Sequence, residues 1–283
     1  MTVLELLNKT AGYFESKGIE NSRLEAEILI CEALHCKRMD IYSDFEKTVT
    51  ESEKEILREF LRRRVSGEPL QYITGKQQFR FLELKTQKGV FIPRQETEII
   101  VSLALDFLKG KNEPAVIEVG TGTGAIALSI AKEGSFHVDV TEIDENAVSL
   151  AKENAAENGL SEKVKINKGA YFEGFEKNKY DLVVSNPPYI PEGDYESLPE
   201  DVKKEPVGAL IAPEEGLKIV KELLQKSVAL LKDEGCVIIE IATEQGEEVS
   251  AFAGNLGFTG KLEKDLTGAI RFYKGIYGNG KSK

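Results

Sequence analysis

Hydrophobic positions recur at two different spacings along the chain, and the change of spacing divides it into two parts. Up to about residue 75, apolar side chains return every three or four positions, which is the repeat of an amphipathic helix. Leu24, Ile28 and Leu29 show this spacing, and Thr50 lies where a cap would begin a later helix. The pattern predicts a small helical domain over residues 1–75, with no strand. We separately expect this domain to serve substrate recognition.

The remainder of the chain alternates between strand-like and helix-like segments. Residues 77–92 alternate well enough to predict a hairpin, so residues 76–94 are expected to form a linker. From residue 95, short continuous apolar runs alternate with helical stripes, as in a parallel sheet covered on both faces. We therefore predict an α/β fold with a doubly wound, mostly parallel, Rossmann-like sheet over residues 95–283. The expected strands cover residues 115–119, 137–143, 180–185, 236–241 and 271–277, the last as an antiparallel edge.

A glycine-rich loop, Glu118-Val-Gly-Thr-Gly-Thr-Gly124, follows the first of these strands and leads into a helix. Glycines let the backbone turn tightly and let a ligand approach the main chain. Glu142 comes 20 residues after Gly122, at the end of the next strand, where a carboxylate can accept both hydroxyls of a ribose. The loop and the acid together predict a cofactor that contains a nucleoside.

The spacing of this loop leaves the type of cofactor open. Gly120, Gly122 and Ala125 also fit a dinucleotide-binding pattern, so a nicotinamide-dependent oxidoreductase remains an alternative. Glu118 discriminates between a dinucleotide and S-adenosylmethionine. A carboxylate two positions before the first glycine repels a pyrophosphate and favours the ammonium and sulfonium groups of S-adenosylmethionine. The loop therefore favours S-adenosylmethionine, and a catalytically silent nucleotide-binding scaffold is a third possibility.

The tetrapeptide Asn186-Pro187-Pro188-Tyr189 directly follows the strand that ends at Ser185. It should face the same crevice, because parallel sheets bind ligands at the carboxyl ends of their strands. An amide nitrogen is a poor nucleophile, since its lone pair is delocalised, and the positive charge it develops needs stabilisation. The Asn186 side-chain oxygen and the Pro187 carbonyl can accept its two N–H bonds. Pro188 holds Pro187 extended and Tyr189 offers a flat face, so we predict methyl transfer to a planar NH2 group.

The charge of the chain bears on the kind of substrate. Residues 1–85 hold 14 Lys and Arg against 15 Asp and Glu, and the remainder holds 23 against 33, a net charge of −10. An acidic catalytic region lacks the electrostatic footprint of a phosphate backbone. An adenine-N6 DNA or RNA methyltransferase remains an alternative, because an exocyclic amine fits the same tetrapeptide, but the charge disfavours nucleic acid.

The remaining composition is that of an ordinary globular protein. The N-terminal segment lacks the apolar core of a secretory signal, and no run approaches the roughly 18 apolar residues that span a bilayer. Three scattered cysteines suit a reducing compartment, and Cys31 and Cys36 do not have a metal-binding spacing. We expect a cytoplasmic monomer without metal or membrane contact.

These motifs together resemble the release-factor glutamine methyltransferases of the HemK type. The likeness covers residues 20–273 and rests on the segments 62–75, 91–98, 118–124, 185–190, 205–206 and 265–271. It implies a class I methyltransferase that transfers a methyl group to the side-chain nitrogen N5 of a glutamine. The expected target is the Gly-Gly-Gln tip of a peptide-chain release factor, with no direct contact to nucleic acid.

The resemblance also implies roles for single residues. Asn186 and Pro187 are the expected catalytic groups, and Pro188 and Tyr189 help them hold the glutamine. Ala170 stands where an Asp is common, so the contact to the adenine amino group must come from elsewhere. The residues expected to bind S-adenosylmethionine, which leaves as S-adenosylhomocysteine, are Phe91, Pro93, Arg94, Glu118, Gly120, Thr121, Gly122, Thr123, Gly124, Glu142, Ile143, Ala170, Tyr171 and Asn186.

Overall fold

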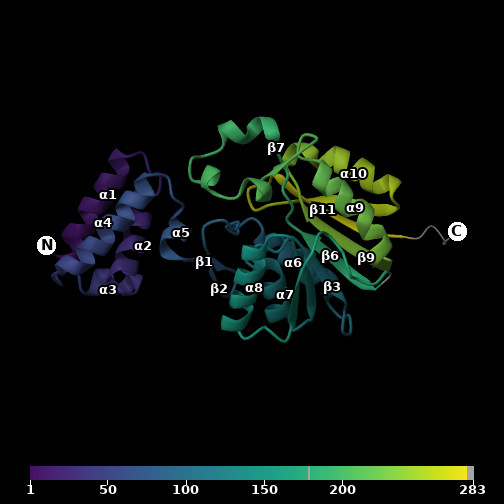
Figure 1. Ribbon diagram of the computed structural model, residues 1–283, viewed down its shortest axis with the longest axis horizontal. Helices are drawn as coiled ribbons and strands as arrows, with labels where there is room; N and C mark the ends of the chain where they lie inside the picture. The colour runs from purple at the N-terminus through teal and green to yellow at the C-terminus, as the bar shows by residue number, and fades with distance from the viewer. Residues whose placement is uncertain (178, 279–283) are drawn as a thin grey trace. The chain divides into compact units, whose positions relative to one another are not determined.

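The computed structural model describes residues 1–177 and 179–278. They form two compact units, drawn in Figure 1. The helical unit consists of Met1–Gly75 together with the short segment Glu200–Lys204, and the catalytic unit consists of Lys76–Pro199 and the chain from Glu205 onward. The chain therefore crosses between the two units three times.

The helical unit has the all-helical character that its hydrophobic spacing predicts. Two of its helices begin at capping boxes, in which Thr2 pairs with Glu5 and Thr50 with Glu53. Its core consists of buried residues from the longer helices, among them the fully buried Phe14. The helices are α1 Val3–Ser16, α2 Ser22–Leu34, α3 Arg38–Ser43, α4 Glu51–Val65 and α5 Leu70–Thr74.

An arginine at the end of α4 attaches the segment Glu200–Lys204 to this unit. The Arg64 guanidinium donates to the Glu25 carboxylate at 2.6 Å and to Asp201 at 3.4 Å. Only 13% of the Arg64 side chain is exposed, so this arginine belongs to the packing of the unit and not to a solvated helix face. The segment contains the single 3-10 turn η2, Val202–Lys204.

The catalytic unit is built on a seven-stranded sheet with the order β10-β11-β9-β6-β3-β4-β5. The five strands from β9 to β5 run parallel, and β11 and β10 pair antiparallel at one side. This arrangement confirms the predicted doubly wound, mostly parallel α/β fold. The strands are β3 Val116–Val119, β4 Val138–Glu142, β5 Val164–Lys168, β6 Tyr180–Ser185, β9 Leu231–Glu240, β10 Phe258–Lys264 and β11 Ile270–Tyr277.

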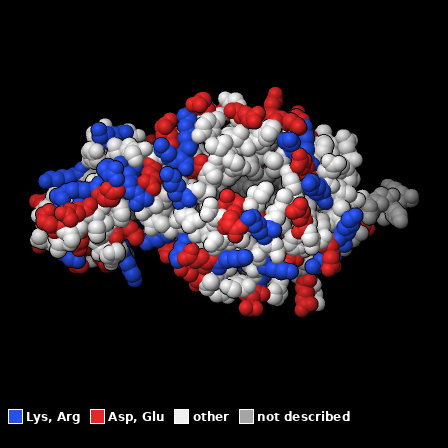
Figure 2. All heavy atoms as spheres, in the orientation of Figure 1, with Lys and Arg blue, Asp and Glu red and all other residues white. Residues whose placement is uncertain are grey.

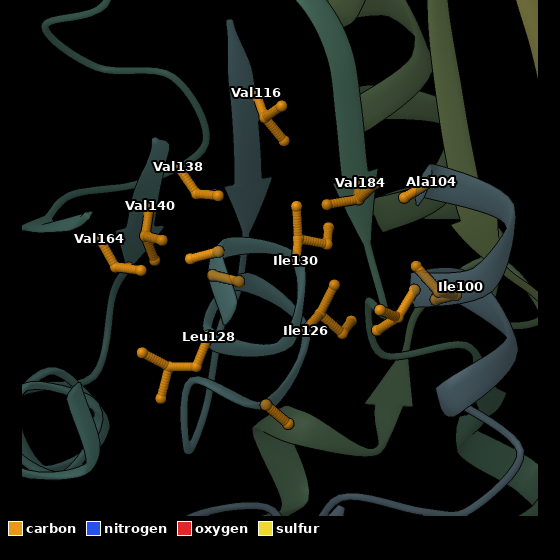
Figure 3. Packing of buried hydrophobic residues seen from close by; sticks show 14 of the residues in the cluster. Ile100, Ala104, Val116, Ile126, Leu128, Ile130, Val138, Val140, Val164 and Val184 are labelled. Atoms are coloured by element: carbon orange, nitrogen blue, oxygen red, sulfur yellow. The ribbon is translucent and has the colours of Figure 1, made fainter. Parts of the chain in front are cut away.

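Helices cover both faces of this sheet, because its strands send alternate side chains to opposite sides. In β3, Val116 belongs to a buried cluster that includes residues of α6, α7 and α8, whereas Ile117 belongs to a second cluster that includes residues of α9 and α10. Figure 3 shows the first of these layers, where Ile126 and Ile130 of α7 meet the valines of the strands. The helices are α6 Glu98–Leu108, α7 Ala125–Gly134, α8 Glu145–Glu157, α9 Lys218–Leu230 and α10 Gly246–Asn255.

One expectation about the sheet is wrong. The strand predicted at the antiparallel edge, which is β11, is antiparallel but lies one place inside the edge, since β10 pairs along its outer side. The sequence of β10, FTGKLEK, is mostly polar, and most of its residues are exposed. A solvated edge strand of this kind lacks the apolar run by which buried strands are recognised.

Shorter elements complete the catalytic unit. The predicted hairpin forms from β1 Lys76–Phe79 and β2 Leu82–Lys85, and β7 Ile190–Pro191 pairs with β8 Ile211–Ala212. Among the described residues no helix is both long and apolar enough to cross a bilayer. Figure 2 shows acidic and basic side chains intermixed over the visible face. The 3-10 turns of the catalytic unit are η1 Glu192–Ser197, η3 Val207–Ala209 and η4 Thr243–Gln245.

Candidate active site

A cavity of about 560 Å³ lies at the carboxyl ends of β3, β4 and β6. Its volume is within the range of about 300–1,000 Å³ that small-molecule sites occupy. It brings together most of the residues that the sequence singles out. The predicted residues that line it are Phe91, Pro93, Glu118, Gly120, Thr121, Gly122, Thr123, Glu142, Ile143, Ala170, Tyr171, Asn186, Pro187 and Pro188. Arg94, Gly124 and Tyr189 are the predicted residues outside this lining.

The glycine loop presents its backbone to the cavity. Gly120 and Gly122 have φ angles of +71° and +57°, in the left-handed region that favours glycine. A Cβ atom at either position would have open space around it, so a ligand can approach the main chain there. Gly124 differs, because a Cβ there would lie 2.9 Å from the Leu128 side chain. Its role is to pack the start of α7, and not to line the cavity.

Glu118 places a buried carboxyl group below this loop. Its Oε2 accepts hydrogen bonds from the Thr121 hydroxyl at 2.6 Å and from the Ala127 backbone N–H at 3.0 Å. Burial raises the pKa of Glu118 to about 8, and the nearby Glu142 acts in the same direction. A cationic ligand close to Glu118 would bind favourably, because its positive charge would stabilise the ionised carboxylate.

Glu142 lies at the end of β4 with both carboxylate oxygens directed by the main chain. The Gly122 N–H donates to its Oε2 at 2.9 Å, and the Asp144 N–H donates to its Oε1 at 3.0 Å. Each oxygen keeps further lone pairs, so the carboxylate can also accept from two neighbouring hydroxyls of a ribose. The polar groups of the cavity therefore fit S-adenosylmethionine. Glu142 can accept hydrogen bonds from the ribose diol, and the buried Glu118 can compensate the cationic part.

Tyr171 forms one wall of the cavity beside Ala170. Its φ angle is +50°, and its hydroxyl donates to the Glu222 carboxylate at 2.6 Å. The Lys226 ammonium lies 4.1 Å from the centre of its ring, which holds the aromatic plane from outside. Ala170 leaves no side chain long enough to reach a ligand amino group, which agrees with the gap expected from its sequence.

Asn186 follows β6 and faces the cavity together with Pro187 and Pro188. The Ser185 hydroxyl donates to the Val119 carbonyl at 2.7 Å, which ties the end of β6 to the end of β3. The Asn186 side-chain nitrogen donates to the Thr97 hydroxyl oxygen at 3.1 Å. These two hydrogen bonds hold the tetrapeptide at the carboxyl end of β6.

Tyr189 makes a contact that its position in the sequence does not predict. Its hydroxyl donates to Oε1 of Glu240 at 3.1 Å, and its carbonyl accepts from Nε2 of Gln245 at 2.9 Å. Gly216 has a φ angle of +81°, and a Cβ there would lie 1.9 Å from the same carbonyl oxygen. The last residue of the tetrapeptide is therefore held by packing and hydrogen bonds behind the cavity.

The loop Phe91–Arg94 is fixed by a buried acid. Glu205 accepts from the Ile92 N–H at 2.9 Å and forms an ion pair with the Arg94 guanidinium, which lies 4.9 Å from the Phe91 ring centre. Phe91 and Pro93 can therefore line the cavity while Arg94 supports them from outside. The same arrangement gives Glu205 a structural role that the sequence alone does not assign.

Thr97, Glu240 and Gln245 are buried polar residues beside the tetrapeptide for which sequence reasoning gives no role. The signal for Glu240 was present, because it interrupts the apolar run from Cys236 to Ile241 and a carboxylate inside a buried strand requires partners. Thr97 gives no such signal. Only the folded chain brings it to Asn186, across 89 positions.

Comparison with known proteins identifies relatives over nearly the whole chain. Residues 5–75 match the family model of the PrmC N-terminal domain, and residues 81–199 match that of the methyltransferase small domain. The release factor glutamine methyltransferase of Rhodopirellula baltica is 38% identical over 248 residues, which are 85% of this chain and 84% of that protein. That of Geobacter sulfurreducens is 36% identical over 260 residues, which are 91% of this chain and 90% of that protein.

Solved structures of methyltransferases share the fold. The hMettl16 catalytic domain aligns with a TM-score of 0.58 and 18% identity, over 70% of this chain and 75% of that one. A methyltransferase from Pyrococcus furiosus aligns with a TM-score of 0.52 and 20% identity, over 70% of this chain and 89% of that one. At such identities the likeness supports the architecture of the catalytic unit alone.

Proposed function

Since the chain belongs to the family of release factor glutamine methyltransferases, we propose that its cavity joins S-adenosylmethionine to a glutamine side chain of a peptide-chain release factor. The chain is a methyltransferase that uses this cofactor, and the product is a glutamine methylated on its side-chain nitrogen. The observation that carries the assignment to the cavity is that Asn186 and Glu142, from two different strand ends, line the same hollow.

The cofactor end of the cavity is formed by the glycine loop and two acids. Glu142 accepts the ribose hydroxyls, and Glu118 compensates the cationic amino acid portion from below the loop. Gly120 and Gly122 allow the main chain to touch the ligand, and Tyr171 covers the adenine. S-adenosylmethionine, when bound, would supply an electrophilic methyl group: its S–CH3 bond would break as the methyl group bonds to the amide nitrogen, S-adenosylhomocysteine would leave, and the methylated nitrogen would lose one proton to water.

The acceptor end orients the glutamine and stabilises its charge. The Asn186 side-chain oxygen and the Pro187 carbonyl accept the two N–H bonds of the amide, which fixes the direction of the nitrogen lone pair. Both acceptors point negative ends of dipoles at a nitrogen that becomes positive during transfer. Holding the reacting atoms in line contributes several of the roughly 7–11 kcal/mol that orientation can supply.

The test is mass spectrometry of a release factor after incubation with the protein and S-adenosylmethionine. We expect one added methyl group on the glutamine of a Gly-Gly-Gln peptide. Asn186→Ala should lower kcat by about 100- to 1,000-fold while the Kd for S-adenosylmethionine changes by less than about twofold.

The matched control is Asn255→Ala, at an exposed position at the end of α10. This variant should keep full activity. Methyl groups that appear only in material digested by nuclease would contradict the assignment. So would an Asn186→Ala variant that loses turnover and cofactor affinity together, because Asn186 would then act chiefly in cofactor binding or folding.

A further inference from the structure

A chain of hydrogen bonds runs from the cavity to a buried carboxyl group behind it. The Asn186 side-chain nitrogen donates to the Thr97 hydroxyl oxygen at 3.1 Å, and that hydroxyl donates to Oε2 of Glu240 at 2.8 Å. Oε1 of Glu240 accepts from the Tyr189 hydroxyl at 3.1 Å. Thr97 is 3% exposed and Glu240 is 2% exposed, so these bonds are shielded from water.

The chemistry of these groups determines which way the Asn186 amide points. An ionised carboxylate can only accept hydrogen bonds, so the single proton of the Thr97 hydroxyl goes to Glu240. The hydroxyl then offers only lone pairs to Asn186, and only the NH2 group of the amide can use them. The amide oxygen is left on the cavity side, which is the orientation that an N–H donor from a substrate needs.

We propose that Glu240 and Thr97 are positioning residues, which hold the Asn186 amide with its nitrogen inward and its oxygen toward the methyl acceptor. This inference rests on the proposed role of Asn186 in binding the glutamine. The buried negative charge also polarises the hydroxyl and the amide, which increases the negative charge on the oxygen that faces the acceptor. Glu240 does not line the cavity, and Thr97, which does, is argued to act through its hydrogen bond to Asn186.

Rigid elements bring the three residues together. Asn186 directly follows β6, Glu240 is the last residue of β9, and Thr97 immediately precedes α6. Strands β6 and β9 pair in parallel, with Ser185 opposite Ile239, so the ends of both strands lie side by side. A network built from adjacent strand ends has little freedom to rearrange, which suits the alignment of a reacting group.

The network makes the orientation of Asn186 depend on the protonation of Glu240. Burial raises the pKa of Glu240 to about 7, the Thr97 and Tyr189 hydroxyls and the Arg271 guanidinium lower it, and Glu96 raises it. Once Glu240 binds a proton, one of its oxygens becomes a donor and the two hydroxyls no longer both have an acceptor. The constraint on the amide is then lost, and turnover should fall as the pH drops below about 7.

The first test replaces the middle of the network. Thr97→Val removes the hydroxyl at nearly constant volume, and it should lower kcat by about 10- to 100-fold, because a misplaced reacting group has an effect of that size. The Kd for S-adenosylmethionine, measured by calorimetry, should stay within about twofold. Thr97→Ser restores a hydroxyl at the same atom and should recover kcat to within about threefold of the unmodified protein.

The second test uses a readout that a merely structural role would not move. At saturating release factor and cofactor, kcat of the unmodified protein should show an acid limb near pH 7, where Glu240 titrates. Glu240→Gln cannot titrate, so its kcat should be lower and should lack this limb. Glu244→Gln, four positions along and exposed, is the matched control and should retain the limb.

These results separate the inference from the function on which it rests. If Asn186→Ala is slow but Thr97→Val turns over like the unmodified protein, the positioning role is wrong and the role of Asn186 stands. If Asn186→Ala is fully active, the proposed function of the cavity fails first. A Thr97→Ser variant as slow as Thr97→Val, or an unchanged acid limb in Glu240→Gln, would also overturn the inference.

Discussion

The two ends of the cavity differ in the groups that hold their functional side chains, which are backbone groups at one end and side chains at the other. At the cofactor end, the contacts of Glu118 and Glu142 include three backbone N–H groups, and the glycine loop offers its own main chain. At the acceptor end, side chains hold side chains, from Asn186 through Thr97 to Glu240. A site made of backbone is specified by a short local motif, whereas a site made of side chains needs residues from distant parts of the chain.

This difference bears on how much change each end can tolerate. At the cofactor end, backbone N–H groups donate to Glu118 and Glu142, and a backbone donor remains when a neighbouring side chain is substituted. We expect the acceptor end to tolerate much less change, because each partner there is a particular side chain.

A large effect, comparable to that of Asn186→Ala, is expected from Gly216→Ala, which changes the acceptor end through packing alone. Its Cβ would lie 1.9 Å from the Tyr189 carbonyl oxygen and 2.6 Å from Nε2 of Gln245. The tetrapeptide must shift, and kcat should fall by about 100-fold or more, since small misplacements have effects of this size. The Kd for S-adenosylmethionine should stay within about threefold, and calorimetry measures it.

Gly193→Ala is the control for this variant, because a Cβ at Gly193 meets no atom within 4 Å and its φ is not positive. It should be as active as the unmodified protein. Equal losses of kcat and cofactor affinity in Gly216→Ala would mean that the two ends are not independent, which would break the comparison between them.

A middle-sized effect is expected at the cofactor end from Glu118→Gln. The variant cannot compensate a cationic ligand, so the Kd for S-adenosylmethionine at pH 7.5 should weaken by about 10- to 100-fold. kcat at saturating cofactor should change by less than about threefold. A Thr97→Val variant should show the reverse pattern, which sharpens the division between the two ends.

The pH dependence of cofactor binding tests the same residue. Because burial raises the pKa of Glu118 to about 8, the free protein holds a proton at lower pH that must leave when a cation binds. The Kd of the unmodified protein should therefore tighten by about tenfold from pH 6 to pH 7. Glu118→Gln should bind equally at both pH values, and the exposed Glu145→Gln should keep the full dependence. A flat profile in the unmodified protein would refute the role of Glu118.

The smallest effect is expected from Ala170→Asp, which restores the residue usual in the family. An Asp there can accept the adenine amino group, and one added hydrogen bond should tighten the Kd for S-adenosylmethionine by about two- to fivefold. The gain should vanish with a cofactor analogue that has a carbonyl in place of that amino group. kcat should not change, because the acceptor end is untouched. Equal gains with both cofactors would contradict an adenine contact.

Much of the fold follows from the sequence, and the exceptions have a common cause. Buried strands such as β3 and β6 consist mostly of apolar residues, which makes them recognisable in the sequence. The strands β5 and β10, VKINK and FTGKLEK, are not among those expected from the sequence. Each contains two lysines, because these strands form the two edges of the sheet and meet solvent. For the same reason the sequence predicts β11 as the edge strand, although β10 lies outside it.

The residues of the site also fall into two groups, those that a local motif reveals and those that only the fold brings together. The glycine loop, Glu142 and the tetrapeptide stand at strand ends, where short motifs reveal them. The bond between Thr97 and Glu240 joins residues 143 positions apart, and no local pattern reports such a pair. Tyr189 illustrates the limit of reasoning from the sequence. Its aromatic ring predicts a flat surface for the substrate, whereas in the folded chain its hydroxyl donates to Glu240.

The five residues Glu200–Lys204 also decide how this protein can be divided. They group with the helices although about 125 residues separate them from Gly75 in the sequence. A shortened chain that starts at Lys76 would lose the Arg64 partner of Asp201 but keep the segment itself. The next residue, Glu205, anchors the loop of Phe91. A methyltransferase unit isolated by a single cut would therefore keep Glu200–Lys204 without its helical partners, directly before the residue that fixes the Phe91 loop of the cavity.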